Sequence, residues 1–360
     1  MKTNTELALR AARFLEEHQE TIAATATGDA WQQNPHWIER YGEAGRARCY
    51  DDAGFHLTHL RQAVQSDSPN LYHSYLEWGR ELLINLKLDG DDISRFMQVI
   101  SDSLPQITGE EESIARIRSL IDSGEAYLEQ HPYCGEMSFM PSEGPLAELA
   151  ARYLQLVLAL KRKEACQLIM KEVDSGLSIR DIYLELFQPV QREVGLLWQR
   201  NQISVAAEHY CTATTQWVMS QLYPMIFSEN EPERRVLTTC VGGNLHEIGI
   251  RMVADLFELS GWDSMFVGAN MPLAGILDAI DEFEPHLLAI SVTLTTHLPQ
   301  LEEVIATVRR SHTPQQLPIM VGGLPFHYEP NLWQQIGADA TAIDAEQAVN
   351  TAIELLEHSA

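Results

Sequence analysis

The loop that follows one apolar strand in the C-terminal third of the chain constrains the fold most. Residues 234–241 predict a short buried strand, and residues 250–260 carry the apolar spacing of an amphipathic helix. Between them lie Asn244, His246 and Gly249. Ligands of α/β proteins bind where loops leave the carboxyl ends of parallel strands, so we predict that His246 points out of such a sheet toward a ligand.

Two further segments repeat this arrangement. Apolar residues 287–290 precede Ser291 and Thr293, and another short apolar strand precedes Gly322 and Gly323. The hydroxyl side chains leave polar groups at a strand end, and the glycines let a large flat ligand approach the backbone. A lone loop histidine is usually an ordinary hydrogen-bonded residue, so the ordered series of three segments carries the prediction of a binding site.

The series of histidine-x-x-glycine, serine-x-threonine and glycine-glycine resembles the cobalamin-binding domain of methionine synthase, corrinoid proteins and cobalamin photoreceptors, over residues 234–358. The resemblance implies a Rossmann-like parallel-sheet domain in which His246 is the lower axial ligand of cobalt. It also implies that Ser291 and Thr293 line the channel for the cofactor's nucleotide tail, where the two glycines leave it room.

Asn244 departs from the methyl-carrier members of this family, which have an aspartate two residues before the histidine. An aspartate can share the imidazole proton and adjust the basicity of the ligand. Asparagine can only hydrogen-bond to the histidine. This difference argues against proton-coupled tuning of cobalt for repeated methyl transfer.

Residues 146–230 predict a four-helix cap preceding this domain. The expected helices cover residues 146–160, 164–175, 179–198 and 205–227, with a kink expected at Pro189. A bundle in this position would cover the upper face of the corrin ring.

Within the cap, Trp198 is followed after nine residues by Glu208 and His209, a spacing that resembles the cap of CarH-type light-dependent repressors. The resemblance implies that Trp198 packs over the upper axial group and that Glu208 accepts hydrogen bonds from adenosine, which favours adenosylcobalamin over methylcobalamin. The alternative is a core tryptophan beside a solvated helix start. Gln199 replaces the histidine that ligates cobalt after photolysis in that family, so His209 or water would take that place.

Residues 1–131 predict an all-helical domain of globin-like size, joined to the cap by a turn-rich linker at residues 132–145. The expected helices cover residues 4–26, 44–66, 70–86, 93–104 and 110–129, with a break near Gly28. Aromatic and histidine side chains are frequent here, most often a sign of core packing, and Arg46 and Arg48 are candidates to meet ligand carboxylates.

This domain order resembles the photocobilins, which pair cobalamin with a bilin. The resemblance implies a sensor domain that binds biliverdin or another bilin, while haem or no ligand stays open. Five cysteines are scattered without metal-ligand spacing, and we expect buried thiols, with Cys49 and Cys134 as minor candidates for covalent chromophore attachment.

A net charge of −26, from 51 acidic and 25 basic residues, argues against direct nucleic-acid binding. Neither a secretory leader nor an apolar run of membrane length is present, so we expect a cytoplasmic protein that acts through a protein partner or a homo-oligomer. Two functions fit: a regulatory adenosylcobalamin photoreceptor, which would not be an enzyme, and a corrinoid methyl carrier of a methyltransferase system.

Overall fold

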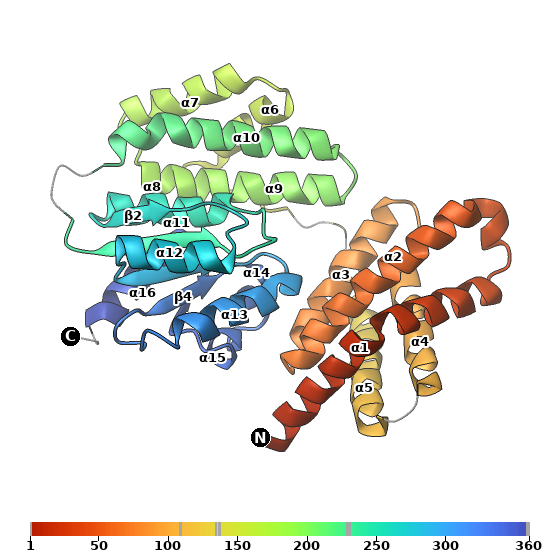
Figure 1. The fold of residues 1–360 in the computed structure, drawn as a ribbon. Helices are drawn as coiled ribbons and strands as arrows, with labels where there is room; N and C mark the ends of the chain where they lie inside the picture. The colour runs from red at the N-terminus through yellow and green to blue at the C-terminus, as the bar shows by residue number, and fades with distance from the viewer. Residues whose placement is uncertain (1, 108–109, 134, 136–137, 228–231, 358–360) are drawn as a thin grey trace. The chain divides into compact units, whose positions relative to one another are not determined.

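The computed structural model describes residues 2–107, 110–133, 135, 138–227 and 232–357. The chain forms two compact units, Met1–Gly135 and Glu136–Ala360 (Figure 1). The fold class predicted from the sequence is confirmed: an all-helical N-terminal region, a helical cap and a C-terminal parallel α/β domain. In the ranges described, no helix is long and apolar enough to cross a lipid bilayer.

The first unit contains the five predicted helices. They are α1 (Lys2–Gln33), α2 (Trp37–Gln65), α3 (Pro69–Asn85), α4 (Asp92–Ser103) with a short 3-10 turn η1 (Leu104–Gln106), and α5 (Glu111–Gln130). The predicted break near Gly28 is wrong, because α1 continues through it to Gln33. A helix tolerates one interior glycine at a cost of about 1 kcal/mol, and buried Trp31 helps to hold this last stretch. The backbone instead departs from helical geometry at Gly42, where φ is +62°.

The second unit begins with the cap, whose four predicted helices are confirmed. They are α6 (Ala147–Leu158), α7 (Arg162–Asp174), a continuous run of α8 (Ile179–Asp181), the π-helical turn η2 (Ile182–Phe187) and α9 (Gln188–Gln199), and α10 (Val205–Leu222) followed by η3 (Tyr223–Met225). Pro189, where the sequence predicts a kink, is the second residue after the π-helical turn. A wider turn at this point lets the helix pass a residue that lacks an N–H donor.

The α/β domain is a five-stranded, wholly parallel sheet in the order β2-β1-β3-β4-β5. Its strands are β1 (Arg235–Cys240), β2 (Asp263–Phe266), β3 (Leu287–Ser291), β4 (Ile319–Gly322) and β5 (Ala340–Ala342). The connecting helices are α11 (Ile248–Leu259), α12 (Leu273–Phe283), η4 with α13 (Thr295–His297, Leu298–Val308), α14 (Leu324–Tyr328), α15 (Leu332–Gln335) and α16 (Ala345–Glu357). The chain order reverses at β1 and β3, which is where such sheets bind ligands.

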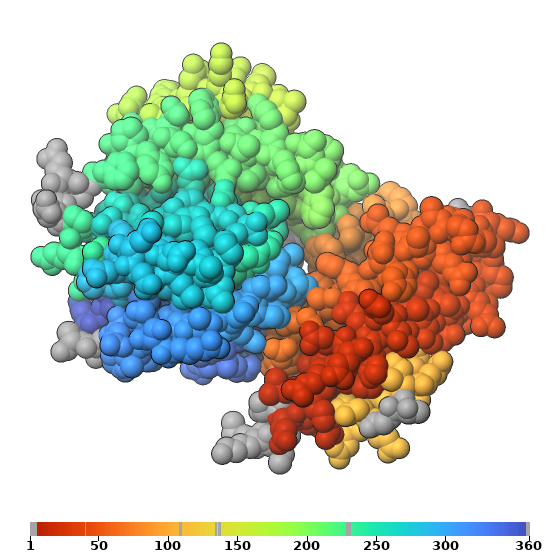
Figure 2. Space-filling view, viewed as in Figure 1, coloured from red at the N-terminus to blue at the C-terminus, as the bar shows by residue number. Residues whose placement is uncertain are grey.

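The cap and the α/β domain share one apolar core. Helices α11 and α16 pack together on one side of the sheet, and α12 packs beside α13. Tyr183 and Phe187 of the cap belong to the same buried cluster as Leu256 of α11 and Val349 of α16. Figure 2 shows the cap, in yellow-green and green, as a continuous layer on the cyan and blue α/β domain.

The carboxyl ends of the central strands are level with one another. Cys240 of β1 pairs with Ser291 of β3, and Ser291 pairs with Gly322 of β4. Beyond β4 the chain turns at Gly323, where φ is +109° and an added Cβ would lie 1.8 Å from the carbonyl oxygen of Val292. The loops after β3 and β4 therefore meet backbone to backbone, which only glycine permits.

We expect Gly323→Ala to lower the local stability of β3 and β4 by about 2 kcal/mol or more, because both the positive φ and the overlap with Val292 oppose a side chain. Gly195→Ala is the matched control, because Gly195 lies inside α9 with open space where the Cβ is added. We expect this variant to keep the wild-type stability or to gain at most about 1 kcal/mol. Hydrogen exchange of the β3 and β4 amides measures both. Equal protection in the two variants would contradict this account of Gly323.

Candidate functional site

Asn244 is the centre of the loop that carries His246. Its side chain is fully buried, and its amide nitrogen donates to the backbone oxygen of Ser291 at 3.0 Å. Its backbone oxygen accepts from the N–H of Asn270 at 2.9 Å, and the Asn270 side chain in turn accepts from the N–H of Gly243 at 2.7 Å. One residue therefore ties together the loops that follow β1, β2 and β3.

The remaining oxygen of Asn244 sets the tautomer of His246. It accepts from the backbone N–H of His246 at 3.2 Å and lies 3.3 Å from the ring nitrogen Nδ1. The bond to Ser291 fixes which end of the amide faces the histidine, and an amide oxygen can only accept. Nδ1 must therefore carry the proton, which leaves Nε2 with a free lone pair for a metal ion.

The surroundings of His246 favour its neutral form. Desolvation by the surrounding protein lowers its pKa, while the carboxylate of Glu208 acts in the opposite direction. Glu208 belongs to α10 of the cap, so this electrostatic contact brings the cap and the β1 loop to one site. A neutral imidazole with a carboxylate near it suits a ligand that takes a metal–nitrogen bond on one side and hydrogen bonds on the other.

The cap contributes the other predicted residues. Trp198 is the second-last residue of α9, and 40% of its surface is exposed, which is more than a core residue would show. Glu208 is one quarter exposed at the start of α10, and its Oε2 lies 2.5 Å from Nδ1 of the more exposed His209. These side chains offer a large ring and a carboxylate at the edge of the cap.

The five other predicted positions lie where the sequence places them in the fold. Gly249 is in the first turn of α11, and an added Cβ there would meet open space. Ser291 ends β3, and its backbone oxygen is used by Asn244. Thr293 is half-buried in the next loop. Gly322 ends β4, and Gly323 follows it. The positive φ of Gly323 and its close approach to Val292 already require glycine there, with or without a ligand.

Sequence reasoning did not find the apolar rim of this edge. Exposed apolar side chains follow four of the five strands: Leu245 after β1, Leu294 after β3, Leu324 after β4 and Ile343 after β5. Leu245 is 71% exposed, beside His246. Exposed apolar groups gathered at one edge mark a surface for a large ligand. In the sequence, this rim shows only as one apolar residue in each loop. Loops with an apolar residue are too common for this pattern to indicate a binding surface.

His297 is a second residue that the sequence did not reveal. It ends η4, after β3, and its Nε2 would lie 3.2 Å from a Cβ added to Gly243. Its Nδ1 is buried and, within the described chain, has no hydrogen-bond partner. Burial lowers the pKa of His297, and the neighbouring His246 lowers it further. A buried ring nitrogen without a partner next to His246 fits a polar group supplied by a ligand.

The cap is also fixed to the α/β domain by polar contacts. Gln216 of α10 donates to Glu247 at 2.8 Å, and the second oxygen of Glu247 accepts from the N–H of Ala269 at 3.0 Å. Tyr183 donates to the buried carboxylate of Asp255 at 2.7 Å. Burial raises the pKa of Asp255, and the hydroxyl of Tyr183 opposes that rise.

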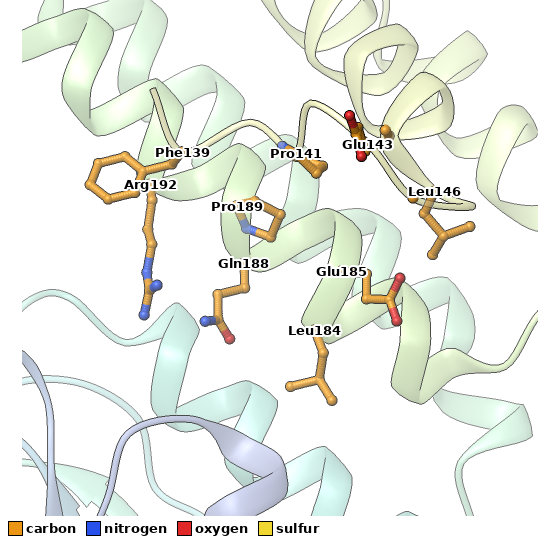
Figure 3. A pocket seen from close by; sticks show the side chains of 11 residues that line it. Phe139, Pro141, Glu143, Leu146, Leu184, Glu185, Gln188, Pro189 and Arg192 are labelled. Carbon is orange, nitrogen blue, oxygen red and sulfur yellow. The ribbon is translucent and has the colours of Figure 1, made fainter. Parts of the chain in front are cut away.

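A pocket of about 240 Å³ lies elsewhere in this unit, between the segment before α6 and the face of η2 and α9 (Figure 3). Phe139, Pro189 and Arg192 are among its lining residues. It contains none of the predicted cofactor-binding residues, and we assign it to the packing of the linker on the cap.

In the first unit, rings gather between α2 and α3. His59 and Tyr75 stack at 3.9 Å, and His56 Nδ1 lies 2.5 Å from the Tyr75 hydroxyl. Burial lowers the pKa of His56 to about 4. The two arginines expected near carboxylates, Arg46 and Arg48, are exposed on α2, and Arg48 lies 3.7 Å from Asp52.

Of the two cysteines considered for chromophore attachment, Cys49 is half-buried on α2, and burial raises the pKa of its thiol. A protonated thiol is a poor nucleophile. Cys134 lies outside the described residues. Cys166, Cys211 and Cys240 are buried, as expected for structural thiols.

Three protein families match successive parts of the chain. Residues 2–129 match the phycobilisome protein family, residues 149–223 a B12 binding domain, and residues 234–353 a second B12 binding domain. Both B12 models cover parts of the unit that holds the site. A neutral Nε2, an apolar rim and the unpartnered nitrogen of His297 fit a corrin with its metal and polar side groups.

Individual proteins similar to this chain include corrinoid proteins and a transcriptional repressor. Dimethylamine corrinoid protein 1 of Methanosarcina acetivorans is 25% identical over 222 residues, covering 60% of this chain and all of the relative. The HTH-type transcriptional repressor CarA of Myxococcus xanthus is 28% identical over 188 residues, covering 51% of this chain and 61% of the repressor. The solved monomethylamine corrinoid protein of Methanosarcina barkeri shares the fold, with a TM-score of 0.52 at 20% identity over 59% of this chain and all of that one.

We expect Asn244→Ala to release the tautomer of His246, because its Nδ1 proton loses the amide oxygen that holds it. Nitrogen NMR of histidine-labelled protein, with the signal assigned through His246→Gln, reports which ring nitrogen is protonated. Asn270→Gly is the control, since it removes a bond to Gly243 in the same loop network without touching the imidazole. A wild-type His246 protonated on Nε2 would contradict the arrangement.

Proposed function

We propose that this chain, a cobalamin-binding protein that joins a phycobilisome-like helical domain to a B12-binding cap and a B12-binding α/β domain, is a light-sensing signalling protein. In this proposal adenosylcobalamin binds between the cap and the α/β domain. The observation that carries it is the position of Glu208 in the cap, close enough to His246 to influence its pKa. A carboxylate there can accept hydrogen bonds from the ribose hydroxyls of adenosylcobalamin, whereas the methyl group of methylcobalamin offers no hydrogen-bond donor.

Each residue then has a defined role. His246 holds cobalt from below through Nε2, and Asn244 keeps its proton on Nδ1. Trp198 packs its exposed ring against the adenosyl group, and Glu208 accepts the ribose hydroxyls. His209, at 2.5 Å from Glu208, orients that carboxylate. Gly249, Ser291, Thr293, Gly322 and Gly323 line the space for the corrin and its tail.

The bound cofactor supplies a cobalt–carbon bond that light can break. The protein responds because Trp198 and Glu208 contact the upper group only while it is present. A ligand shifts a conformational equilibrium by the difference between its contacts in the two states, so loss of the adenosyl group weakens the hold of the cap on the α/β domain. The high negative charge argues against nucleic acid as the receiver of this change, which leaves a protein partner or a second copy of the chain.

The first unit is a candidate second sensor that binds biliverdin or a related bilin. The phycobilisome match over residues 2–129 supports this proposal. Buried polar atoms add to it: among the described residues, both amide atoms of Gln62 and the hydroxyl of Tyr72 have no hydrogen-bond partner. Leaving such a group unpaired costs about 1–3 kcal/mol, which a ligand with pyrrole and carbonyl groups would offset. The raised pKa of Cys49 favours non-covalent binding.

The second candidate function is a corrinoid methyl carrier. Similarity to a dimethylamine corrinoid protein over that relative's full length favours it. Three features favour the light sensor instead: Asn244 in place of a proton-sharing aspartate, the tryptophan and glutamate of the cap, and a helical domain that matches phycobilisome proteins.

Absorption spectra test the proposal directly. Protein loaded with adenosylcobalamin in darkness should change under green light to the spectrum of a water- or histidine-ligated cobalamin, and His246→Ala should lose the histidine-ligated form. If the first unit is a bilin sensor, added biliverdin should stay bound and give a far-red absorption band. The absence of that band, or binding of haem by the first unit instead, would exclude the bilin. A loaded protein that is stable in green light would remove the photoreceptor function.

Selectivity between upper ligands separates the two functions. We expect wild type to bind adenosylcobalamin more tightly than methylcobalamin, and Trp198→Ala to lose about tenfold of that preference, because its ring packs only on the larger group. Titration of both cofactors in darkness measures the ratio. Trp217→Phe is the control, since Trp217 lies on α10, where Arg162 covers its ring. Tight methylcobalamin binding with weak adenosylcobalamin binding would support the methyl carrier.

A further inference from the structure

A chain of polar side chains crosses the cap from its core to the site. Tyr153 of α6 and Thr215 of α10 are fully buried and lie 3.1 Å apart. Gln191 of α9 donates through its amide nitrogen to Thr215 at 2.8 Å. Thr212 of α10 lies 3.1 Å from the amide oxygen of Gln191 and 3.0 Å from a carboxylate oxygen of Glu208. The cap core is thus connected to Glu208 by hydrogen bonds.

The Glu208 carboxylate fixes where the proton of Thr212 goes. A carboxylate can only accept, so the hydroxyl of Thr212 donates its single proton to Glu208. Because threonine hydroxyls both donate and accept, the amide of Gln191 pairs with Thr215 at one end and with Thr212 at the other. The carboxylate is therefore held from α9 through Thr212.

We propose that Thr212 is a positioning residue that holds the Glu208 carboxylate where it accepts hydrogen bonds from a ligand's hydroxyls. This inference rests on the proposed adenosyl site. Thr212 donates to one oxygen of Glu208 whether the site is empty or filled, and its pairing with Gln191 holds it against α9.

The hydrogen bond between Thr212 and Gln191 joins α10 to α9. Helix α9 also carries Glu193, a largely buried carboxylate. Glu193 accepts from the backbone N–H of Phe139 at 2.7 Å and from the hydroxyl of Ser138 at 3.0 Å. Figure 3 shows Phe139 beside Arg192 on this side of α9. The helix that senses Glu208 through Gln191 is therefore the one that anchors the linker segment at residues 138–139.

The test uses two variants of one side chain in the full-length protein. Thr212→Val keeps the shape and removes the hydroxyl, and Thr212→Ser keeps the hydroxyl. We expect Thr212→Val to weaken adenosylcobalamin binding about tenfold, as for a lost hydrogen bond to a charged group, and to leave methylcobalamin binding unchanged. Thr212→Ser should restore it. Thr214→Val makes the same chemical change at another buried threonine of α10, outside this chain of hydrogen bonds, and should match wild type.

Hydrogen exchange in darkness gives a second readout. In wild type, adenosylcobalamin should protect the Phe139 amide and α9 more than methylcobalamin does, and this difference should vanish in Thr212→Val. Wild-type selectivity that survives in Thr212→Val, or an equal loss of affinity for both cofactors, would overturn the role of Thr212 while leaving the photoreceptor intact. A wild-type protein without preference for adenosylcobalamin would instead overturn the proposed function itself.

Discussion

The hydrogen bonds of Asn244 are the interaction on which the site depends. A parallel sheet brings the loops after β1, β2 and β3 to one edge, but loops of this kind have many possible shapes. Asn244 restricts them, because its amide spans from the carbonyl of Ser291 to the ring of His246 while its backbone holds Asn270. The amide of Asn244 is fully buried, so its own donor and acceptor need these partners. The loop is thus held before any ligand arrives, which reduces the cost of ordering it on binding.

The same bonds explain why asparagine serves where an aspartate would be expected. An aspartate at position 244 would place a negative charge in a fully buried position beside a carbonyl oxygen, unless it shared the imidazole proton. Asparagine carries its own donor for the carbonyl of Ser291 and needs no shared proton. It therefore holds the imidazole in one tautomer and removes proton transfer as a means of tuning the metal, which suits a site that holds one cofactor for a long time better than one that cycles through many methyl transfers.

Polar contacts attach the cap at three places along α11. Near the N-terminus of this helix, Gln216 reaches Glu247, at the edge that holds Glu208 and His246, and one turn farther on Arg251 donates to the hydroxyl of Ser220 at 2.8 Å. Asp255, which accepts from Tyr183, lies eight residues after Glu247, about 12 Å along the axis. The distant contact sits in the shared apolar core, and the contact near the ligand edge is polar and part-buried. In the proposed light sensor, a change at the upper site would act first on the contacts near the ligand edge, and the cap would shift there while Tyr183 and Asp255 remain joined.

The strands of the sheet and the surroundings of His246 could be predicted from the sequence, but the contacts that depend on helix packing could not. Residues 234–241 and 287–290 are apolar enough to be buried, and a parallel sheet fixes which loops meet, so the surroundings of His246 followed from order alone. The edge strand β2 has no fully buried residue and gave no such pattern. His297 and the Thr212–Gln191 pair depend on how helices pack across the chain, and their residue types are ordinary in any helix or loop. The role of Thr212 depends on Gln191 from another helix and on Glu208, each at about 3 Å, which only a folded structure supplies, and for that reason the connection from Glu208 to α9 becomes visible only there.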